Sequence, residues 1–134
     1  RSLVKYRLII EEFGGWDLYQ NLLTVLRTIA DRHMTDIATI ALRTSLESND
    51  VAAVIVGARY ADRLQETLHA FDLKLTEEDQ LALDLVLRKR KGPHGRVYDL
   101  ERDLNGRHGK IMKYNLNKGD QKLFSETKSR EANA

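Results

Sequence analysis

Apolar residues recur every three or four positions along most of the chain, the spacing that predicts amphipathic helices. Residues 2–13 predict a first helix that a pair of glycines ends, although the β-branched Ile9 and Ile10 leave a strand as the alternative. Residues 16–33 predict a second helix, whose core-facing side carries Leu18, Leu22, Leu26 and Ile29. These two helices and the next one form an all-helical start to the chain.

A third helix is predicted after Thr35, which can cap it, and its apolar face carries Ile37, Ile40, Ala41, Thr44 and Leu46. Residues 51–56 follow as a short, continuous, β-branched run, the pattern of a strand buried on both faces of a parallel sheet. This is the one robust strand that the sequence predicts, so it has no ladder partner within the chain. We expect a self-associating copy or further polypeptide to pair with it, or the run to take another conformation.

Two more helices are predicted before the character of the chain changes. Residues 61–70 predict a helix with inward-facing Leu64, Leu68 and Phe71. Thr76 with Asp79 three positions later resembles a capping box and begins a helix that carries Leu81, Leu83, Leu85 and Val86. Carboxylates in its first turn suit the positive end of the helix dipole, so we interpret them as surface residues.

Charge divides the chain near the end of this last helix. Residues 1–87 carry a net charge of −5, whereas residues 88–134 carry +7. We therefore divide the chain into a helical portion, residues 1–91, and a basic C-terminal tail, residues 92–134. The basic run at 88–91 suits the negative end of a helix dipole, and we favour that role over a nucleic-acid or nuclear-import patch.

Periodicity fades in the tail. Residues 96–104 predict a short helix, residues 110–116 a strand or extended segment, and residues 118–134 increasing disorder. The tail lacks an aromatic platform interleaved with its cations, which argues against single-strand nucleic-acid binding, although Tyr98 and Tyr114 leave it as an alternative.

Composition excludes several classes of site. The chain has no cysteine, which rules out disulfides, thiolate metal sites and cysteine nucleophiles. Its four histidines, His33, His69, His94 and His108, show no metal-ligand spacing, and no metal site is predicted. The apolar runs are too short to span a membrane and no signal-peptide pattern is present, so we expect a cytoplasmic protein.

The strongest chemical pattern is the run at residues 54–67, VIVGARYADRLQET, in which an apolar strand meets a glycine and then an arginine-bearing helix. A glycine lets the backbone approach a ligand closely, and the helix behind it directs unpaired N–H groups at the same spot. Arg59 and Arg63 are four positions apart and can add charge-assisted hydrogen bonds to a phosphate. The pattern predicts an anion site.

The same run resembles the last β/α unit of the aldo-keto reductases, where it holds the adenosine 2′-phosphate and adenine of NADP(H). Residues 26–43, LRTIADRHMTDIATIALR, and residues 75–79, LTEED, are similar to the helices on either side of that unit, so the likeness spans roughly residues 17–87. The resemblance implies cofactor-binding roles for Gly57, Ala58, Arg59, Arg63, Glu66 and Thr67. Thr67 departs from the family's usual asparagine, which puts the adenine contact in doubt.

The resemblance further implies an α/β fold, the C-terminal fragment of a (β/α)8 TIM barrel, from an oxidoreductase that reduces aldehydes or ketones with NADP(H). The family's catalytic residues lie on earlier strands, so this chain alone is predicted to carry none and to be inactive. By analogy the tail lines the substrate pocket, with His94, Tyr98, His108 and Tyr114 as candidates. The alternative is a stand-alone helical interaction module whose basic tail binds nucleic acid or another acidic partner.

Overall fold

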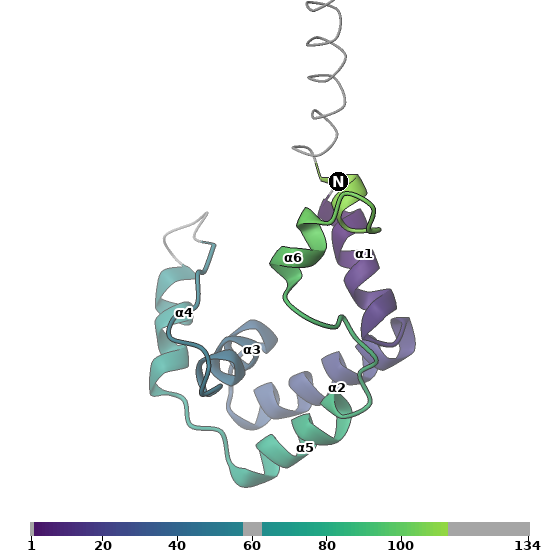
Figure 1. The fold of residues 1–134 in the computed structure, drawn as a ribbon. Coiled ribbons are helices and arrows are strands. Elements are labelled where there is room, and N and C mark those ends of the chain that lie inside the picture. Colours follow the sequence, from purple (N-terminus) through teal and green to yellow (C-terminus); the bar gives the residue numbers. More distant parts are fainter. Residues whose placement is uncertain (1, 58–62, 113–134) are drawn as a thin grey trace, which may run out of the picture. The chain divides into compact units, whose positions relative to one another are not determined.

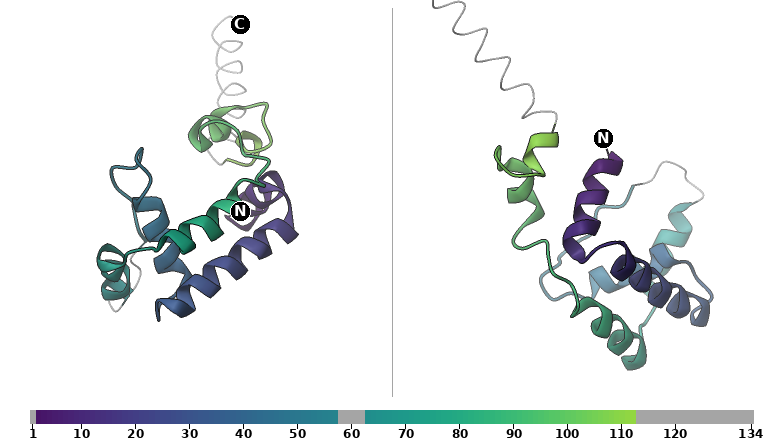
Figure 2. Two further views of the ribbon diagram at one scale, coloured as in Figure 1. Left: turned by 90° about the horizontal axis from the view of Figure 1, so that it is seen from below. Right: turned by 90° about the vertical axis from the view of Figure 1, so that its right-hand side faces the viewer.

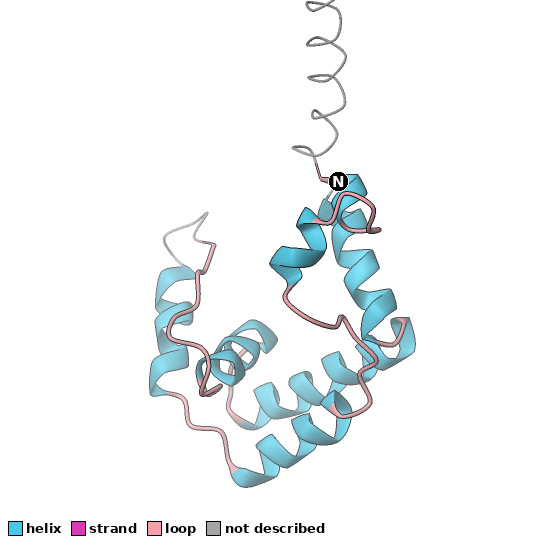
Figure 3. Ribbon diagram, in the orientation of Figure 1, coloured by secondary structure: helices cyan, strands magenta, loops and turns pink. Residues whose placement is uncertain are grey.

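The computed structural model describes residues 2–57 and 63–112, and every regular element in these ranges is a helix (Figures 1 and 3). The elements in chain order are α1 (Ser2–Phe13), α2 (Trp16–Arg32), α3 (Ile37–Leu46), α4 (Arg63–Asp72), α5 (Glu77–Leu87), α6 (Val97–Arg102) and the 3-10 helix η1 (Gly109–Ile111). The prediction of a mainly helical chain is confirmed. The predicted disorder at 118–134, and most of the extended segment predicted at 110–116, lie outside the described residues.

The predicted strand at residues 51–56 is wrong, because these residues run as a loop that follows α3 (Figure 3). A strand is stable only when a neighbour satisfies its backbone N–H and C=O groups, and the described residues contain no second strand. The pattern predicted that Ile55 is buried on a face of a sheet, but its side chain is fully exposed. Composition alone therefore overstated the case for a strand.

Two helices begin at well-formed caps. Thr76 caps α5 as predicted: its hydroxyl accepts from the Asp79 backbone N–H at 3.2 Å, and the Asp79 carboxylate accepts from the Thr76 N–H at 2.9 Å. The cap of α3 is Asp36 rather than the predicted Thr35, and its carboxylate accepts from the Thr39 N–H at 2.6 Å. A carboxylate carries a full charge toward the helix N-terminus, which favours it over a hydroxyl at this position.

The described chain divides into two compact units. The central unit comprises residues 16–90 and contains α2 to α5. The terminal unit joins the two ends of the chain, residues 1–15 and 91–134, and its described helices are α1, α6 and η1. The two are treated separately below.

The central unit is built around an apolar core. α2 packs against both α3 and α5, and α3 in turn packs against α4. The core side chains come from all of these contacts and are Leu26, Ile29, Ala30, Ile40, Leu73 and Leu83. Ile29 and Ile40 are completely buried, as their positions on the predicted apolar faces required. Burying an aliphatic side chain of this size stabilises a fold by about 1.5 to 3 kcal/mol.

A polar cluster joins the end of α2 to the start of α5. Asp79 is completely buried and receives Arg32 Nη2 at 2.5 Å on one carboxylate oxygen and His33 Nε2 at 2.7 Å on the other. Because the last residues of α2 meet the first turn of α5, the two helices run antiparallel, as Figure 2 shows. The prediction that this acidic turn lies at the surface is therefore wrong for Asp79, although Glu78 beside it is exposed.

The apolar face predicted for α4 points outward instead of inward. Leu64, Leu68 and Phe71 are 50%, 55% and 63% exposed, while Ala70 is the buried residue of this helix. α4 packs mainly against α3 among the described elements, so this ten-residue helix buries one narrow side. Leu81 and Leu85 of α5 are exposed in the same way.

Candidate functional site

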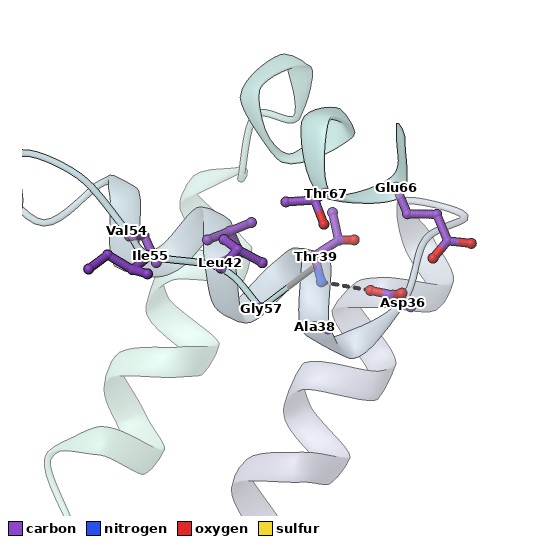
Figure 4. Close-up of a pocket in the computed structure, with 10 residues that line it drawn as sticks. Asp36, Ala38, Thr39, Leu42, Val54, Ile55, Gly57, Glu66 and Thr67 are labelled. Carbon is purple, nitrogen blue, oxygen red and sulfur yellow. Dashed lines mark hydrogen bonds between the residues drawn. The ribbon is translucent and has the colours of Figure 1, made fainter. Parts of the chain in front are cut away.

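A cavity of about 330 Å³ lies where the loop before α4 passes the N-terminal end of α3 (Figure 4). α3 and the residue before it supply one wall, α4 supplies another, and the loop at residues 54–57 supplies the third. The lining residues are Asp36, Ala38, Thr39, Leu42, Val54, Ile55, Val56, Gly57, Glu66 and Thr67. The cavity is therefore formed by segments that are up to 31 positions apart in the sequence.

The structure brings three of the six predicted cofactor residues to this one cavity. Gly57 lines it from the loop, and Glu66 and Thr67 line it from the first turns of α4. Arg63 is the first residue of α4, and its side chain lies outside the described part of the structure. Ala58 and Arg59 also lie outside the described residues.

Gly57 leaves open space at its own position. A side chain built there would meet no atom within 4 Å, so nothing in the described protein occupies the volume beside its backbone. The predicted reason for this glycine, close approach of a ligand to the main chain, requires such space. The geometry is compatible with that reason without requiring it.

Asp36 gives the cavity a fixed negative charge. The backbone N–H of Thr39 donates to its carboxylate and lowers the pKa of Asp36, an effect that burial opposes and that the Arg27 charge supports. Asp36 is therefore ionised throughout the neutral range. One of its oxygens is engaged by the helix cap (Figure 4). The carboxylates of Asp36 and Glu66 make this wall negative, so it binds hydrogen-bond donors such as amine or hydroxyl groups better than it binds an anion.

Sequence reasoning missed the α3 wall of the cavity. Asp36, Ala38, Thr39 and Leu42 were not assigned to any site, because the motif that predicts the anion site is local to residues 54–67. A usable signal was present: aspartate immediately before an apolar helical run is a strong helix-cap residue. Asp36 would have marked the N-terminus of a second helix, but its position beside the loop at residues 54–57 is seen only in the fold.

A more open cavity of about 430 Å³ shares Asp36, Thr39 and Glu66 with the first one. Met34, Thr35 and His69 complete its lining. Although His69 and two carboxylates line it, no group of three metal-binding side chains is positioned to hold an ion anywhere in residues 2–57 and 63–112. The two cavities adjoin on the α3–α4 side of the central unit, and their linings mix apolar and polar side chains.

The tail residues predicted to line a substrate pocket have different surroundings. His94 is exposed, and Tyr98 is 60% exposed with the Arg102 guanidinium 4.0 Å from the centre of its ring. His108 is buried and its Nε2 lies 2.9 Å from Glu12 Oε1. Tyr114 lies outside the described residues. A substrate-lining role for these residues stays a prediction.

Comparison with known families decides the ancestry of the chain. A sequence model described as the aldo/keto reductase family matches residues 2–88, which is well over half of the 134 residues. The chain belongs to the aldo/keto reductase family. The resemblance found in the sequence is thereby confirmed, and the match includes every residue that lines the two cavities.

Membership assigns the chain to a family of oxidoreductases that use NAD(P)H and act on small carbonyl compounds. The family match stops before the described part of the tail that carries α6 and η1. No curated protein and no solved structure matches the chain. Among the described residues, no helix combines the length and the apolar character needed to cross a bilayer.

Proposed function

We propose that this chain forms the cofactor-gripping part of an NADP(H)-dependent aldo-keto reductase, a cytoplasmic (β/α)8-barrel enzyme that reduces aldehydes or ketones by hydride transfer. The observation that supports the proposal most directly is the meeting of Gly57, Glu66 and Thr67 at one cavity. The family match covers all three residues. The strands of the barrel come from polypeptide outside the described residues.

The cavity accommodates the adenosine part of the cofactor. Its walls combine apolar side chains such as Leu42 and Val54 with polar groups from Asp36, Thr39 and Glu66, a mixture typical of small-molecule sites. In this proposal the 2′-phosphate binds near Gly57 and the start of α4, held by Ala58, Arg59, Arg63 and the first N–H groups of α4. Thr67, which replaces the family's usual asparagine, contributes a hydroxyl in place of an amide.

The chain supplies binding without chemistry. Hydride transfer to a carbonyl requires an acid that protonates the developing alkoxide and a nicotinamide held in contact with the substrate. The nicotinamide itself donates the hydride when the cofactor is bound. We assign none of the catalytic groups to residues 1–134, so the chain alone binds the adenosine end weakly and does not turn over.

Cofactor affinity tests the proposal. The 134-residue chain is titrated with NADPH and NADH by calorimetry, beside Arg63→Ala and the control Arg88→Ala, which removes an exposed cation from the end of α5. NADPH is expected to bind more tightly than NADH, because only NADPH carries the 2′-phosphate. Loss of one charge-assisted bond costs about 1.5 to 3 kcal/mol, so Arg63→Ala should bind NADPH roughly ten- to a hundredfold more weakly.

The control separates a specific site from general charge attraction. Arg88→Ala changes the net charge by the same amount and is expected to leave NADPH affinity within about twofold of the parent. Equal weakening by both variants, or equal affinity of Arg63→Ala and the parent chain, contradicts the assignment. The purified chain is also assayed for NADPH oxidation. If it oxidises NADPH, and if substituting one of its own tyrosines or histidines abolishes that activity, the chain contains a catalytic centre and the proposal is contradicted.

A further inference from the structure

The terminal unit is assembled without an apolar core. All eight buried hydrophobic side chains in the described structure belong to the central unit, from Leu26 to Val86. The apolar residues of α1 are at best half-buried, and Leu3 and Tyr6 are 82% and 65% exposed. Among the described side chains of the terminal unit, the buried one is His108. Some other force must hold residues 97–112 against α1.

Ion pairs supply that force. Two ion pairs join α1 to the segment that carries α6 and η1, Lys5 Nζ to Glu101 Oε1 at 2.6 Å and Arg107 Nη2 to Glu11 Oε2 at 2.8 Å. A third polar pair, the hydrogen bond between His108 Nε2 and Glu12 Oε1 at 2.9 Å, lies beside them, and each pair spans 96 positions of sequence. A backbone hydrogen bond from the Lys91 N–H to the Phe13 carbonyl, at 2.9 Å, fixes the point where the segment begins.

We propose that residues 97–112 are an ionic strap, which closes on α1 through these three pairs and releases when salt or acid weakens them, while the central unit stays folded. The Arg107–Glu11 pair is exposed, whereas Lys5–Glu101 and His108–Glu12 are partly buried. Charge pairs near the surface are individually weak and are screened by salt, most strongly where they are exposed, whereas an apolar core is not screened. Raising the ionic strength from about 0.1 M to about 1 M shortens the screening length from about 10 Å to about 3 Å. The strap is therefore the part of the structure that opens first.

Acid releases the strap through its carboxylates. Hydrogen bonds from Arg107 and then Arg7 lower the pKa of Glu11 below its usual value. The stabilisation that ionised Glu11 gives is fully present above the ordinary pKa of a glutamate, and it is lost as the pH falls through the lower pKa that Glu11 has in the folded chain. The other carboxylates at the contact are Glu12, which faces His108, and Glu101, which faces Lys5.

Hydrogen–deuterium exchange of the 134-residue chain tests the proposal. The peptides compared are those covering residues 97–112 and those covering α2, first at about 0.1 M and then at about 1 M sodium chloride. We expect exchange in the strap to rise about tenfold with salt, while exchange in α2 changes by less than about twofold. Lowering the pH below the glutamate range at low salt is expected to open the strap in the same way, after correction for intrinsic exchange.

Charge reversal identifies the pairs as the cause. Lys5→Glu places two carboxylates together and should open the strap at low salt, and the double variant Lys5→Glu with Glu101→Lys should close it again. Lys74→Glu makes the same charge change on the exposed surface of the central unit and should leave the strap closed. Exchange in α2 reports whether each variant is folded.

Three results would overturn the proposal: strap exchange that ignores salt, a double variant as open as Lys5→Glu, or α2 opening together with the strap. The first would mean that unrecognised packing holds the segment. The second would mean that Lys5 acts by another route. The third would mean that the terminal and central units unfold as one.

Discussion

The central and terminal units hold their helices together by opposite means. The central unit buries aliphatic side chains from four helices, with one buried carboxylate, Asp79, satisfied on both oxygens at its edge. The terminal unit buries one histidine and relies on exposed or half-exposed ion pairs. An apolar core is not screened by salt, whereas charge pairs near the surface are. The comparison therefore predicts where the chain is robust and where it yields.

Removing core volume should produce the largest effect and should do so in the central unit alone. Ile29 is completely buried, so Ile29→Ala is expected to lower the free energy of unfolding by about 4 kcal/mol through lost burial and the cavity it leaves. Ile10→Ala makes the same change on a half-buried residue of α1 and should cost about 1 kcal/mol. Urea denaturation followed by circular dichroism measures both. Equal losses would break the comparison.

Removing the buried carboxylate should be the next largest change. Asp79→Ala removes the carboxylate half of the α5 capping box and leaves His33 without its partner, for an expected loss in the free energy of unfolding of about 3 kcal/mol. Its neighbour Glu78 pairs with the same Arg32 but is 79% exposed, so Glu78→Ala should change stability by less than about 0.5 kcal/mol. Urea denaturation measures both losses. Because Asp79 and Glu78 both pair with Arg32, the ratio of the two losses reports how much burial of the carboxylate matters.

Acid should weaken the central unit through Asp79. Burial raises the pKa of this carboxyl, but hydrogen bonds from His33 and Thr76 together with the Arg32 charge outweigh it and lower the pKa overall. Its stabilising contribution is therefore complete above the ordinary aspartate value of about 4 and disappears as the pH falls through the lower folded value. Melting temperatures recorded from neutral to acid pH should fall in that window for the parent chain. The Asp79→Asn variant should have a lower melting temperature than the parent chain at neutral pH, and its melting temperature should change less as the pH falls.

The smallest predicted change is a gain in stability at the end of α2. Met34 has a φ of 52° and is 94% exposed, where it terminates the helix as the Thr35 N–H donates to the Ala30 carbonyl at 2.9 Å. A left-handed backbone conformation costs a residue with a side chain about 1 to 2 kcal/mol, and glycine avoids this cost. Glycine also raises the conformational entropy of the unfolded chain, which offsets part of the gain. Met34→Gly should therefore stabilise the central unit by about 0.5 to 1 kcal/mol. A lower melting temperature would show that Met34 makes a contact the strain argument omits.

The helices could be predicted because each one repeats its apolar residues with helical spacing and ends at a residue that breaks it. α1 and the capping box of α5 are clear cases. The inward faces of α4 and α5 were harder, because periodicity says which residues share a face but not whether another element covers it. Leu68 and Leu85 share faces that the described residues leave open. The run at 51–56 failed for the same reason, since a strand depends on a partner that local sequence does not supply.

The candidate site was predicted in its local part only. Gly57, Glu66 and Thr67 lie within one motif and line one cavity, whereas Asp36 and Thr39 reach that cavity through the packing of α3 on α4. The buried carboxylate of Asp79 was equally out of reach, because an acidic helix start is at the surface in most proteins. Long-range juxtapositions of this kind depend on the fold and leave no spacing in the sequence.

The most direct test of the account is to map where the adenosine end of the cofactor binds. Amide chemical shifts of the isotopically labelled chain are followed by NMR while 2′,5′-ADP is added, with 5′-ADP as the control that lacks the 2′-phosphate. The account predicts shifts at Gly57, Glu66, Thr67 and Thr39 that saturate, with smaller changes for 5′-ADP and none in the ionic strap. Shifts confined to the basic residues at 88–91, or equal responses to both nucleotides, would contradict the proposed site.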